Sequence, residues 1–175
     1  MGKSTTDIQT SRLCLRVISD SDEDKLIALL TNNEIRKTFM VPELRTISEQ
    51  MQMFDALKAM SHSAEHFVRG IYLRDDLIGF LNDVLIAGKE IEIGYVIDPS
   101  QKNQGYMTEA LNAAISAMFD AGYSVVRAGA FEENAASIRV MEKCGMHKTT
   151  QTEEMEYNGS VHRCVFFQVE KTQNL

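Results

Sequence analysis

The sequence predicts an α+β fold in which a mixed, mostly antiparallel sheet of about seven strands is flanked by about four helices. Short runs with apolar residues at every second position predict strands, and longer runs with apolar residues three or four positions apart predict helices. These elements occur as one strand, two helices, three strands, and then a helix, a strand, a helix and a hairpin. No repeat or linker interrupts the order, so we expect one domain over residues 1–175 with helices on both faces of the sheet.

The N-terminal part is expected to hold one strand and two helices. Apolar and polar residues alternate over residues 10–18, which predicts a strand. The run of Ser and Asp residues after it supplies capping side chains for a helix over about residues 22–32. Ser48 is the expected N-cap of a longer helix that extends to about residue 64.

Three strands joined by short turns follow, which predicts antiparallel pairing. We expect them over residues 67–73, 76–86 and 90–98, with a short connection at residues 87–89. Side chains along a strand point alternately to its two faces. The third strand therefore places Ile91, Ile93, Tyr95 and Ile97 on one face, and Glu90, Glu92, Gly94 and Val96 on the other.

The C-terminal part alternates helices and strands before it ends in a hairpin. Glycines at positions 122 and 145 follow the two helices, where a helix commonly ends. The expected elements are a helix over residues 108–121, a buried strand over 124–130, a helix over 135–144, and two strands over 148–157 and 163–170 joined through Asn158 and Gly159.

The composition is that of a soluble globular protein, with 44% apolar and 25% charged residues among 175. The formal net charge of −7 argues against nucleic acid as the main partner, because phosphate backbones select basic surfaces. The charge is compatible with a cationic acceptor such as an amine, and equally with a simple role in solubility. No apolar run reaches membrane-spanning length and no hydrophobic signal segment is present, so we expect a cytoplasmic protein with no membrane partner.

The cysteines and histidines do not predict a metal site. Cys14, Cys144 and Cys164 are odd in number and widely spaced, which fits neither a disulfide framework nor a zinc site. We expect buried free thiols. The histidines share no spacing typical of metal ligands, so no metal is expected.

The most informative segment is the polar stretch over residues 98–111. An apolar strand ends there in a glycine-bearing turn that opens directly into a helix. That arrangement aims free backbone N–H groups and the positive end of a helix dipole at an anion such as phosphate. Gly105 lets the backbone approach a ligand closely because it has no Cβ. Taken alone, the pattern is also that of an ordinary capped turn.

The same stretch resembles the acetyl-coenzyme A pyrophosphate loop of the GNAT superfamily of N-acetyltransferases, which reads Gln/Arg-x-x-Gly-x-Gly/Ala and is followed in one branch by Thr-Glu-Ala. Three more segments resemble landmarks of the ribosomal-protein N-terminal acetyltransferase branch. They are Thr-Ser-Arg-Leu-Cys-Leu-Arg at residues 10–16, Glu-Ile-Gly-Tyr at 92–95, and Asn-Ala-Ala-Ser-Ile-Arg-Val-Met-Glu-Lys-Cys-Gly-Met at 134–146. With four landmarks in the right order over residues 10–169, the chain is identified as a member of that superfamily.

The resemblance implies acetyl-coenzyme A as co-substrate and the GNAT fold. Lys102 stands where the family has Gln or Arg and can still pair with phosphate, whereas Met107 is bulkier than the usual Ala or Gly. The family's pantetheine arm is bound by strand backbone that corresponds to Val96 and Ile97. The expected cofactor-binding residues are Val96, Ile97, Lys102, Asn103, Gln104, Gly105, Tyr106, Met107, Thr108, Asn134, Ser137 and Lys143.

Two residues are expected to be catalytic. An alkyl amine with a pKa near ~10 must lose a proton before it attacks a thioester. The resemblance implies Glu92 as the general base or amine-orienting group; the alternative is a carboxylate on a solvated sheet face. Many members carry a tyrosine acid where Met141 stands here, so the resemblance implies Ser137 as the acid, with a helix-bonded serine as the alternative.

The expected reaction is direct attack of an amine on the bound thioester, without a covalent enzyme intermediate. A protein N-terminal α-amine is the favoured acceptor. A small amine such as a polyamine, amino acid or aminoglycoside remains open, as does a sensor that binds acyl-coenzyme A without turnover. The oligomeric state also stays open, a homodimer included. The resemblance implies an acceptor groove that involves Glu34, Arg36, Phe39, Met40, Tyr157, Asn158 and His162.

Overall fold

A computed structural model of the chain describes residues 6–172. In this range the strands are β1 (Ile8–Gln9), β2 (Leu13–Arg16), β3 (Arg69–Leu73), β4 (Asp76–Ala87), β5 (Glu90–Ile97), β6 (Val125–Phe131), β7 (His147–Tyr157) and β8 (Ser160–Glu170). The α-helices are α1 (Glu23–Thr31), α2 (Ile47–His62), α3 (Tyr106–Asp120) and α4 (Ala135–Lys143). Short 3-10 turns are η1 (Asp20–Asp22), η2 (Ile35–Lys37) and η3 (Pro99–Gln101). The α+β class expected from the sequence, with one mixed sheet and four helices among the described residues, is confirmed.

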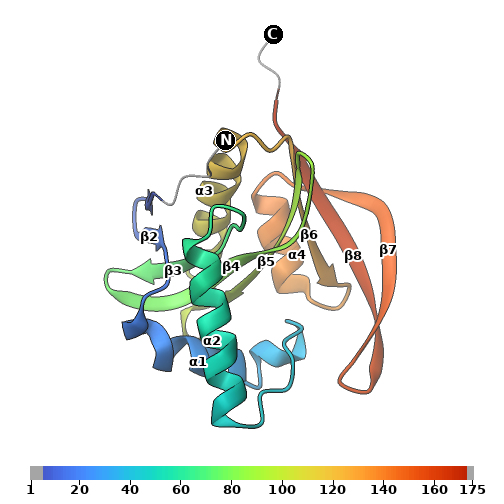
Figure 1. The fold of residues 1–175 in the computed structure, drawn as a ribbon. Coiled ribbons are helices and arrows are strands. Elements are labelled where there is room, and N and C mark those ends of the chain that lie inside the picture. The colour runs from blue at the N-terminus through green and yellow to red at the C-terminus, as the bar shows by residue number, and fades with distance from the viewer. Residues whose placement is uncertain (1–5, 173–175) are drawn as a thin grey trace.

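The strands form one sheet in the order β1-β2-β3-β4-β5-β6-β8-β7 (Figure 1). Neighbouring strands are antiparallel except β5 and β6, which are parallel. That parallel pairing covers only Glu90–Glu92 against Val125–Arg127, and the rest of the two strands is not paired with each other. The sheet therefore opens between β5 and β6 beyond Glu92, in the middle of the molecule.

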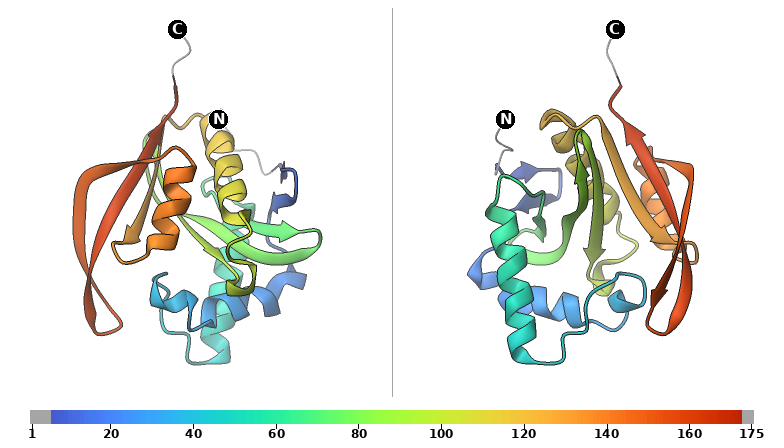
Figure 2. Two further views of the ribbon diagram at one scale, coloured as in Figure 1. Left: turned by 180° about the vertical axis from the view of Figure 1, so that it is seen from behind. Right: turned by 45° about the vertical axis from the view of Figure 1, so that its right-hand side comes forward.

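Helices cover both faces of the sheet, as the alternation of apolar residues predicts (Figure 2). Ile91 and Ile93 of β5 are buried in one core with side chains of α3 and α4. Val96, on the opposite face of the same strand, is buried in a second core with side chains of α1 and α2. Strand β5 thus belongs to both cores, which holds it in place beside the opening in the sheet.

Three local predictions need correction. The sheet has eight strands among the described residues instead of about seven, because the short β1 pairs with β2. The first predicted strand is shorter than residues 10–18, since Thr10 turns back to donate its N–H to the carbonyl of Leu13 at 2.9 Å. The N-cap of α2 is Thr46 and not Ser48: the Thr46 side chain accepts from the Glu49 N–H, and the Glu49 carboxylate accepts in return from the Thr46 N–H.

The other boundaries agree with the sequence to within a few residues. Helix α3 begins two residues earlier than predicted because Gly105 serves as its N-cap. All three cysteines are free; Cys144 and Cys164 are buried as expected, whereas Cys14 is only partly buried. Among residues 6–172, no helix combines the length and apolarity that crossing a membrane requires.

Candidate active site

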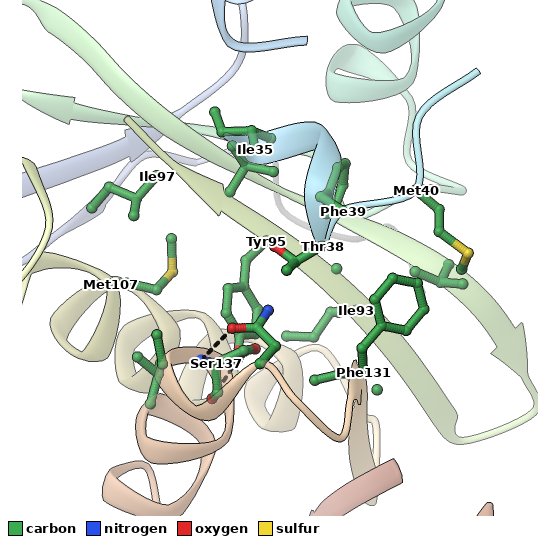
Figure 3. Close-up of a pocket in the computed structure, with 18 of the residues that line it drawn as sticks. Ile35, Thr38, Phe39, Met40, Ile93, Tyr95, Ile97, Met107, Phe131 and Ser137 are labelled. Carbon is green, nitrogen blue, oxygen red and sulfur yellow. Dashed lines mark hydrogen bonds between the residues drawn. The ribbon is translucent and has the colours of Figure 1, made fainter. Parts of the chain in front are cut away.

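A cavity of about 930 Å³ lies where β5 and β6 diverge. The rest of its wall comes from strands β4, β7 and β8, from helix α4, from η2 and the residues after it, and from the loop that leads into the start of α3. Figure 3 shows Ile97 and Met107 at one end of the cavity, Phe39, Met40 and Phe131 at the other, and Tyr95 beside Ser137 between them. The two ends have different chemistry.

The first end holds the open N-terminus of α3. Gly105 is the N-cap with φ +79°, a left-handed conformation that glycine adopts without strain, and it has no side chain with which to cap the helix. The first intrahelical hydrogen bond runs from the Glu109 N–H to the Gly105 carbonyl at 3.0 Å. The N–H groups of Tyr106, Met107 and Thr108 therefore have no acceptor within the helix. This end of the cavity suits an anion such as a pyrophosphate.

The loop before α3 is held by Arg12. Its Nε lies 2.7 Å from Glu109 Oε2, and its Nη1 donates to the Gln104 carbonyl at 2.9 Å. Partial burial raises the pKa of Glu109, but hydrogen bonds from Thr10, Arg12 and Ser11 outweigh this effect and hold that pKa at about 2. The Thr-Ser-Arg segment and the Thr-Glu-Ala segment, which the sequence presents as separate landmarks, are thus two halves of one contact.

Lys102 forms an ion pair with Glu34 across the cavity mouth. Both residues line the cavity, and both side chains are about half exposed. A hydrogen bond and the charge of Lys102 lower the pKa of Glu34. The pair connects the loop of the anion-binding end to the segment between α1 and α2, which forms part of the other end.

At the second end, Glu92 is the last residue of β5 that pairs with β6. Its side chain is half-buried, so it does not lie on a solvated sheet face. Burial raises the pKa of Glu92, the nearby carboxylate of Glu153 raises it further, and Arg127 opposes the shift. The Arg127 guanidinium lies 3.2 Å from Glu90. A carboxylate whose pKa is raised toward neutrality suits proton abstraction.

Ser137 lies between the two ends. Asn134 is the N-cap of α4, as predicted, and its Oδ1 accepts from the Ser137 N–H at 3.2 Å. The Ser137 hydroxyl lies 2.7 Å from the Tyr95 hydroxyl, which is also 3.1 Å from the Ser137 carbonyl oxygen (Figure 3). Met141 is fully buried in the core beneath α4. Its side chain packs against apolar neighbours in that core and does not line the cavity, whereas Ser137 does.

The backbone of β5 faces the cavity at alternate residues. A Cβ placed on Gly79 of β4 would lie only 2.2 Å from the Val96 carbonyl oxygen, so that carbonyl points toward β4. Because N–H and C=O groups of successive strand residues point to opposite sides, those of Ile97 point toward the opening between β5 and β6. Of the two backbone positions named from the sequence, Ile97 therefore offers its polar groups to the cavity, and Val96 contributes a buried side chain.

The hairpin between β7 and β8 closes over the second end. The Tyr157 hydroxyl donates to the Phe39 carbonyl at 3.2 Å, and the Asn158 amide donates to the Arg36 carbonyl at 3.1 Å. His162 stacks on Phe131 with a centroid separation of 4.3 Å and is bonded to Glu133. Of the residues expected in the acceptor groove, Glu34, Phe39 and Met40 line the cavity. Arg36, Tyr157 and Asn158 instead join the β7–β8 hairpin to the segment between α1 and α2, and His162 packs on Phe131.

The structure brings together most of the site residues that the sequence predicts. Glu92, Ser137 and all of the expected cofactor-binding residues except Gln104 line the cavity; the Gln104 carbonyl is bound to Arg12 instead. Sequence reasoning missed Tyr95 and Glu153 as parts of the site. The signal for Tyr95 was a hydroxyl on the otherwise aliphatic face of β5. Within residues 6–172, no group of three or more potential metal ligands is present.

Residues 12–147 match the family described as Acetyltransferase (GNAT) domain. A Bacillus subtilis (strain 168) protein described as uncharacterized N-acetyltransferase YoaA is 31% identical over 146 residues, which cover 81% of this chain and 82% of that protein. The solved structure of RimL, described as a ribosomal L7/L12 alpha-N-protein acetyltransferase in complex with coenzyme A, has a TM-score of 0.85 at 19% identity and covers 94% of this chain and 98% of RimL. The microcin C7 self-immunity acetyltransferase MccE, in complex with acetyl-CoA and AMP, has a TM-score of 0.80 at 17% identity, with 93% and 94% covered.

Proposed function

The chain belongs to the GNAT acetyltransferase family, and from that premise we propose that it acetylates the α-amine of a protein N-terminus. It is an N-acetyltransferase, and acetyl-coenzyme A is its co-substrate. The observation that carries the proposal is Glu92, a half-buried carboxylate with a raised pKa inside the cavity. The likeness to RimL supports a protein N-terminus as the acceptor. The acidic pair of Glu92 and Glu153 suits an acceptor that arrives as a cation.

In the proposed reaction Glu92 accepts a proton from the amine, and the free amine attacks the thioester carbonyl. The new C–N bond forms as the C–S bond breaks, and the electron pair of that bond leaves with the sulfur. The nitrogen then releases a second proton, and the sulfur takes up one proton to give the free thiol of coenzyme A. The Ser137 hydroxyl donates a hydrogen bond to the departing sulfur. The N–H of Ile97 is available to the carbonyl oxygen as charge develops on it. Each group named here lines the same cavity.

A covalent enzyme intermediate is not part of this mechanism. Burial raises the pKa of the Cys144 and Cys164 thiols to about 11. The thiolate is the nucleophilic form of cysteine, so both side chains are poor nucleophiles at neutral pH. Direct transfer from acetyl-coenzyme A to the amine requires no such group.

A small-molecule amine is the second candidate acceptor, because the β7–β8 hairpin is bonded to the segment between α1 and α2. The contacts of Tyr157 with Phe39 and of Asn158 with Arg36 close one side of the acceptor end. A closed side favours a slender acceptor, which a small amine and an extended peptide N-terminus both satisfy. The acceptor panel below separates them.

The function is tested by thiol release from acetyl-coenzyme A. The panel contains an unblocked tetrapeptide that begins with serine, the same peptide with a blocked N-terminus, spermidine and an aminoglycoside. We expect release with the unblocked peptide and none with the blocked one. Release with spermidine or the aminoglycoside alone would establish the small-amine candidate. Binding of acetyl-coenzyme A without release for any amine would contradict the proposal.

Replacing Glu34 with glutamine is expected to strengthen acetyl-coenzyme A binding about two- to fivefold. The ion pair with Glu34 competes with phosphate for Lys102, and exposed ion pairs are weak, so the gain is small. Calorimetric titration with acetyl-coenzyme A measures it. The control is Glu43→Gln, which removes the carboxylate of another exposed pair, with Arg45. Equal affinities for wild type and the Glu34 variant would show that Lys102 does not bind the cofactor.

A further inference from the structure

We propose that Tyr95 is a positioning residue that aims the hydroxyl of Ser137 at the departing sulfur. The inference rests on the proposed function, in which Ser137 donates a hydrogen bond to that sulfur. It goes beyond it by naming a second hydroxyl, supplied by strand β5, that controls which way the serine points. Tyr95 belongs to the Glu-Ile-Gly-Tyr segment at residues 92–95, but it is not among the catalytic or cofactor-binding residues expected from the sequence.

Tyr95 and Ser137 come from the two walls that enclose the cavity. Tyr95 lies on the face of β5 that packs against α3 and α4, and its ring is largely buried against that core. Its hydroxyl reaches the first turn of α4, 2.7 Å from Ser137 Oγ and 3.1 Å from the Ser137 carbonyl oxygen. The Ser137 N–H is bound to Asn134, so the backbone of the serine is held as well.

The two hydroxyls together have two hydrogens, which allows two arrangements. In the first, Ser137 donates to the Tyr95 oxygen, and Tyr95 donates to the Ser137 carbonyl. In the second, Tyr95 donates to Ser137 Oγ, and the serine hydrogen is free for an acceptor in the cavity. A sulfur that gains negative charge is such an acceptor, so it stabilises the second arrangement. The change needs only rotation of the two hydroxyl groups about their C–O bonds, which moves the hydrogens and no heavy atom.

Without Tyr95 the serine has another partner nearby. Serine hydroxyls in helices commonly bond to the carbonyl three or four residues earlier. For Ser137 those residues are Asn134 and Glu133, at the start of α4. The Tyr95 hydroxyl competes for Ser137 Oγ and keeps it on the cavity side. Burial also raises the pKa of Tyr95, so its hydroxyl keeps its hydrogen at every pH at which the enzyme is assayed.

Helix α4 has no hydroxyl at the position of Met141, where the family resemblance implies a tyrosine in many members. Met141 stands there and is fully buried in the core. In this chain the tyrosine hydroxyl that meets α4 comes from β5. Its oxygen contacts Ser137, which places it one step away from the reacting atoms and makes it a positioning residue.

The test is a double-mutant cycle of Tyr95→Phe and Ser137→Ala. The assay is thiol release from acetyl-coenzyme A with the unblocked tetrapeptide, and with spermidine if that is the accepted amine. We expect Tyr95→Phe to lower kcat about tenfold with less than about a twofold change in KM for acetyl-coenzyme A, since only orientation is lost. Ser137→Ala should lower kcat about 10- to 100-fold. The double variant should be no slower than Ser137→Ala, because Tyr95 acts through the serine.

The matched control is Tyr72→Phe, which removes a buried hydroxyl bonded to Asp22 at 2.7 Å in the other core. Its kcat should equal that of wild type. An unchanged kcat for Ser137→Ala would overturn the proposed role of Ser137, and the inference with it. A slow Ser137→Ala beside a fully active Tyr95→Phe would overturn the inference alone. Effects that multiply in the double variant would also overturn it, because they would show that Tyr95 acts independently of Ser137. A Tyr95→Phe protein that no longer binds acetyl-coenzyme A would overturn it too, because it would show a structural role for Tyr95.

Discussion

Replacing Glu92 with glutamine is expected to lower kcat about 100- to 1,000-fold while acetyl-coenzyme A binds as before. Glutamine keeps the shape of the side chain but cannot accept a proton, and a positioned general base contributes roughly 10²- to 10⁴-fold to rate. Glu92 lines the cavity and directly precedes Ile93 on β5. Figure 3 shows Ile93 well away from Met107 at the start of α3, so the pyrophosphate end is not disturbed. Steady-state thiol release and calorimetric titration measure the two quantities separately.

The pH dependence of the rate distinguishes a base from an orienting group. Glu92 acts as a base only when ionised, and burial together with Glu153 raises its pKa above the ordinary carboxyl value. The rate kcat/KM should therefore fall as pH decreases through this raised pKa, and the Glu92→Gln variant should lack that decline. Glu153→Gln removes the neighbouring negative charge, so the decline should move to lower pH.

Glu154→Gln is the control for Glu153→Gln. Glu154 is the next residue on strand β7, is exposed, and does not line the cavity. It should leave the pH profile unchanged. A Glu92→Gln enzyme that retains both its kcat and its acidic decline would show that another group, or water alone, removes the proton. The mechanism proposed above would then be wrong at its first step.

Replacing Gly79 with alanine is expected to destabilise the protein by about 3 kcal/mol and to abolish cofactor binding. The added Cβ would lie 2.2 Å from the Val96 carbonyl oxygen and 3.1 Å from the Ile97 Cα. Both atoms are backbone, so no side chain can turn aside, and β5 must move away from β4. That movement displaces the strand whose other edge faces the cavity.

Thermal unfolding and acetyl-coenzyme A titration measure these effects. At roughly 2–4 °C for each kcal/mol in a domain of this size, the expected decrease in Tm is about 6–12 °C. Gly88→Ala is the control: Gly88 has φ +60° in the hairpin between β4 and β5, and a Cβ there would meet nothing within 4 Å. Its cost is the left-handed strain alone, about 1–2 kcal/mol, with cofactor binding retained. If the two variants were equally stable, the close approach of β4 and β5 would not matter.

Periodicity and local motifs predicted much of the fold. The alternation along β5 placed Ile91 and Ile93 in one core and Val96 in the other, and the structure confirms it. Local patterns were less reliable where two side chains compete for one role. Thr46 and Ser48 are both good N-caps, and the carboxylate of Glu49 decides between them because it completes a capping box only with Thr46.

The sequence by itself determined the family landmarks, the strand that leads into the anion-binding loop, and a set of catalytic and cofactor-binding residues that line the cavity with the exception of Gln104. These depend on neighbours a few positions apart, and spacing along the chain reports such neighbours directly. Only the tertiary structure decided which distant residues meet. The contacts of Arg12 with Glu109 and of Tyr95 with Ser137 join segments separated by 97 and 42 residues. The raised pKa of Glu92 likewise depends on burial and on Glu153 of another strand, and burial and facing charge exist only after the sheet has formed.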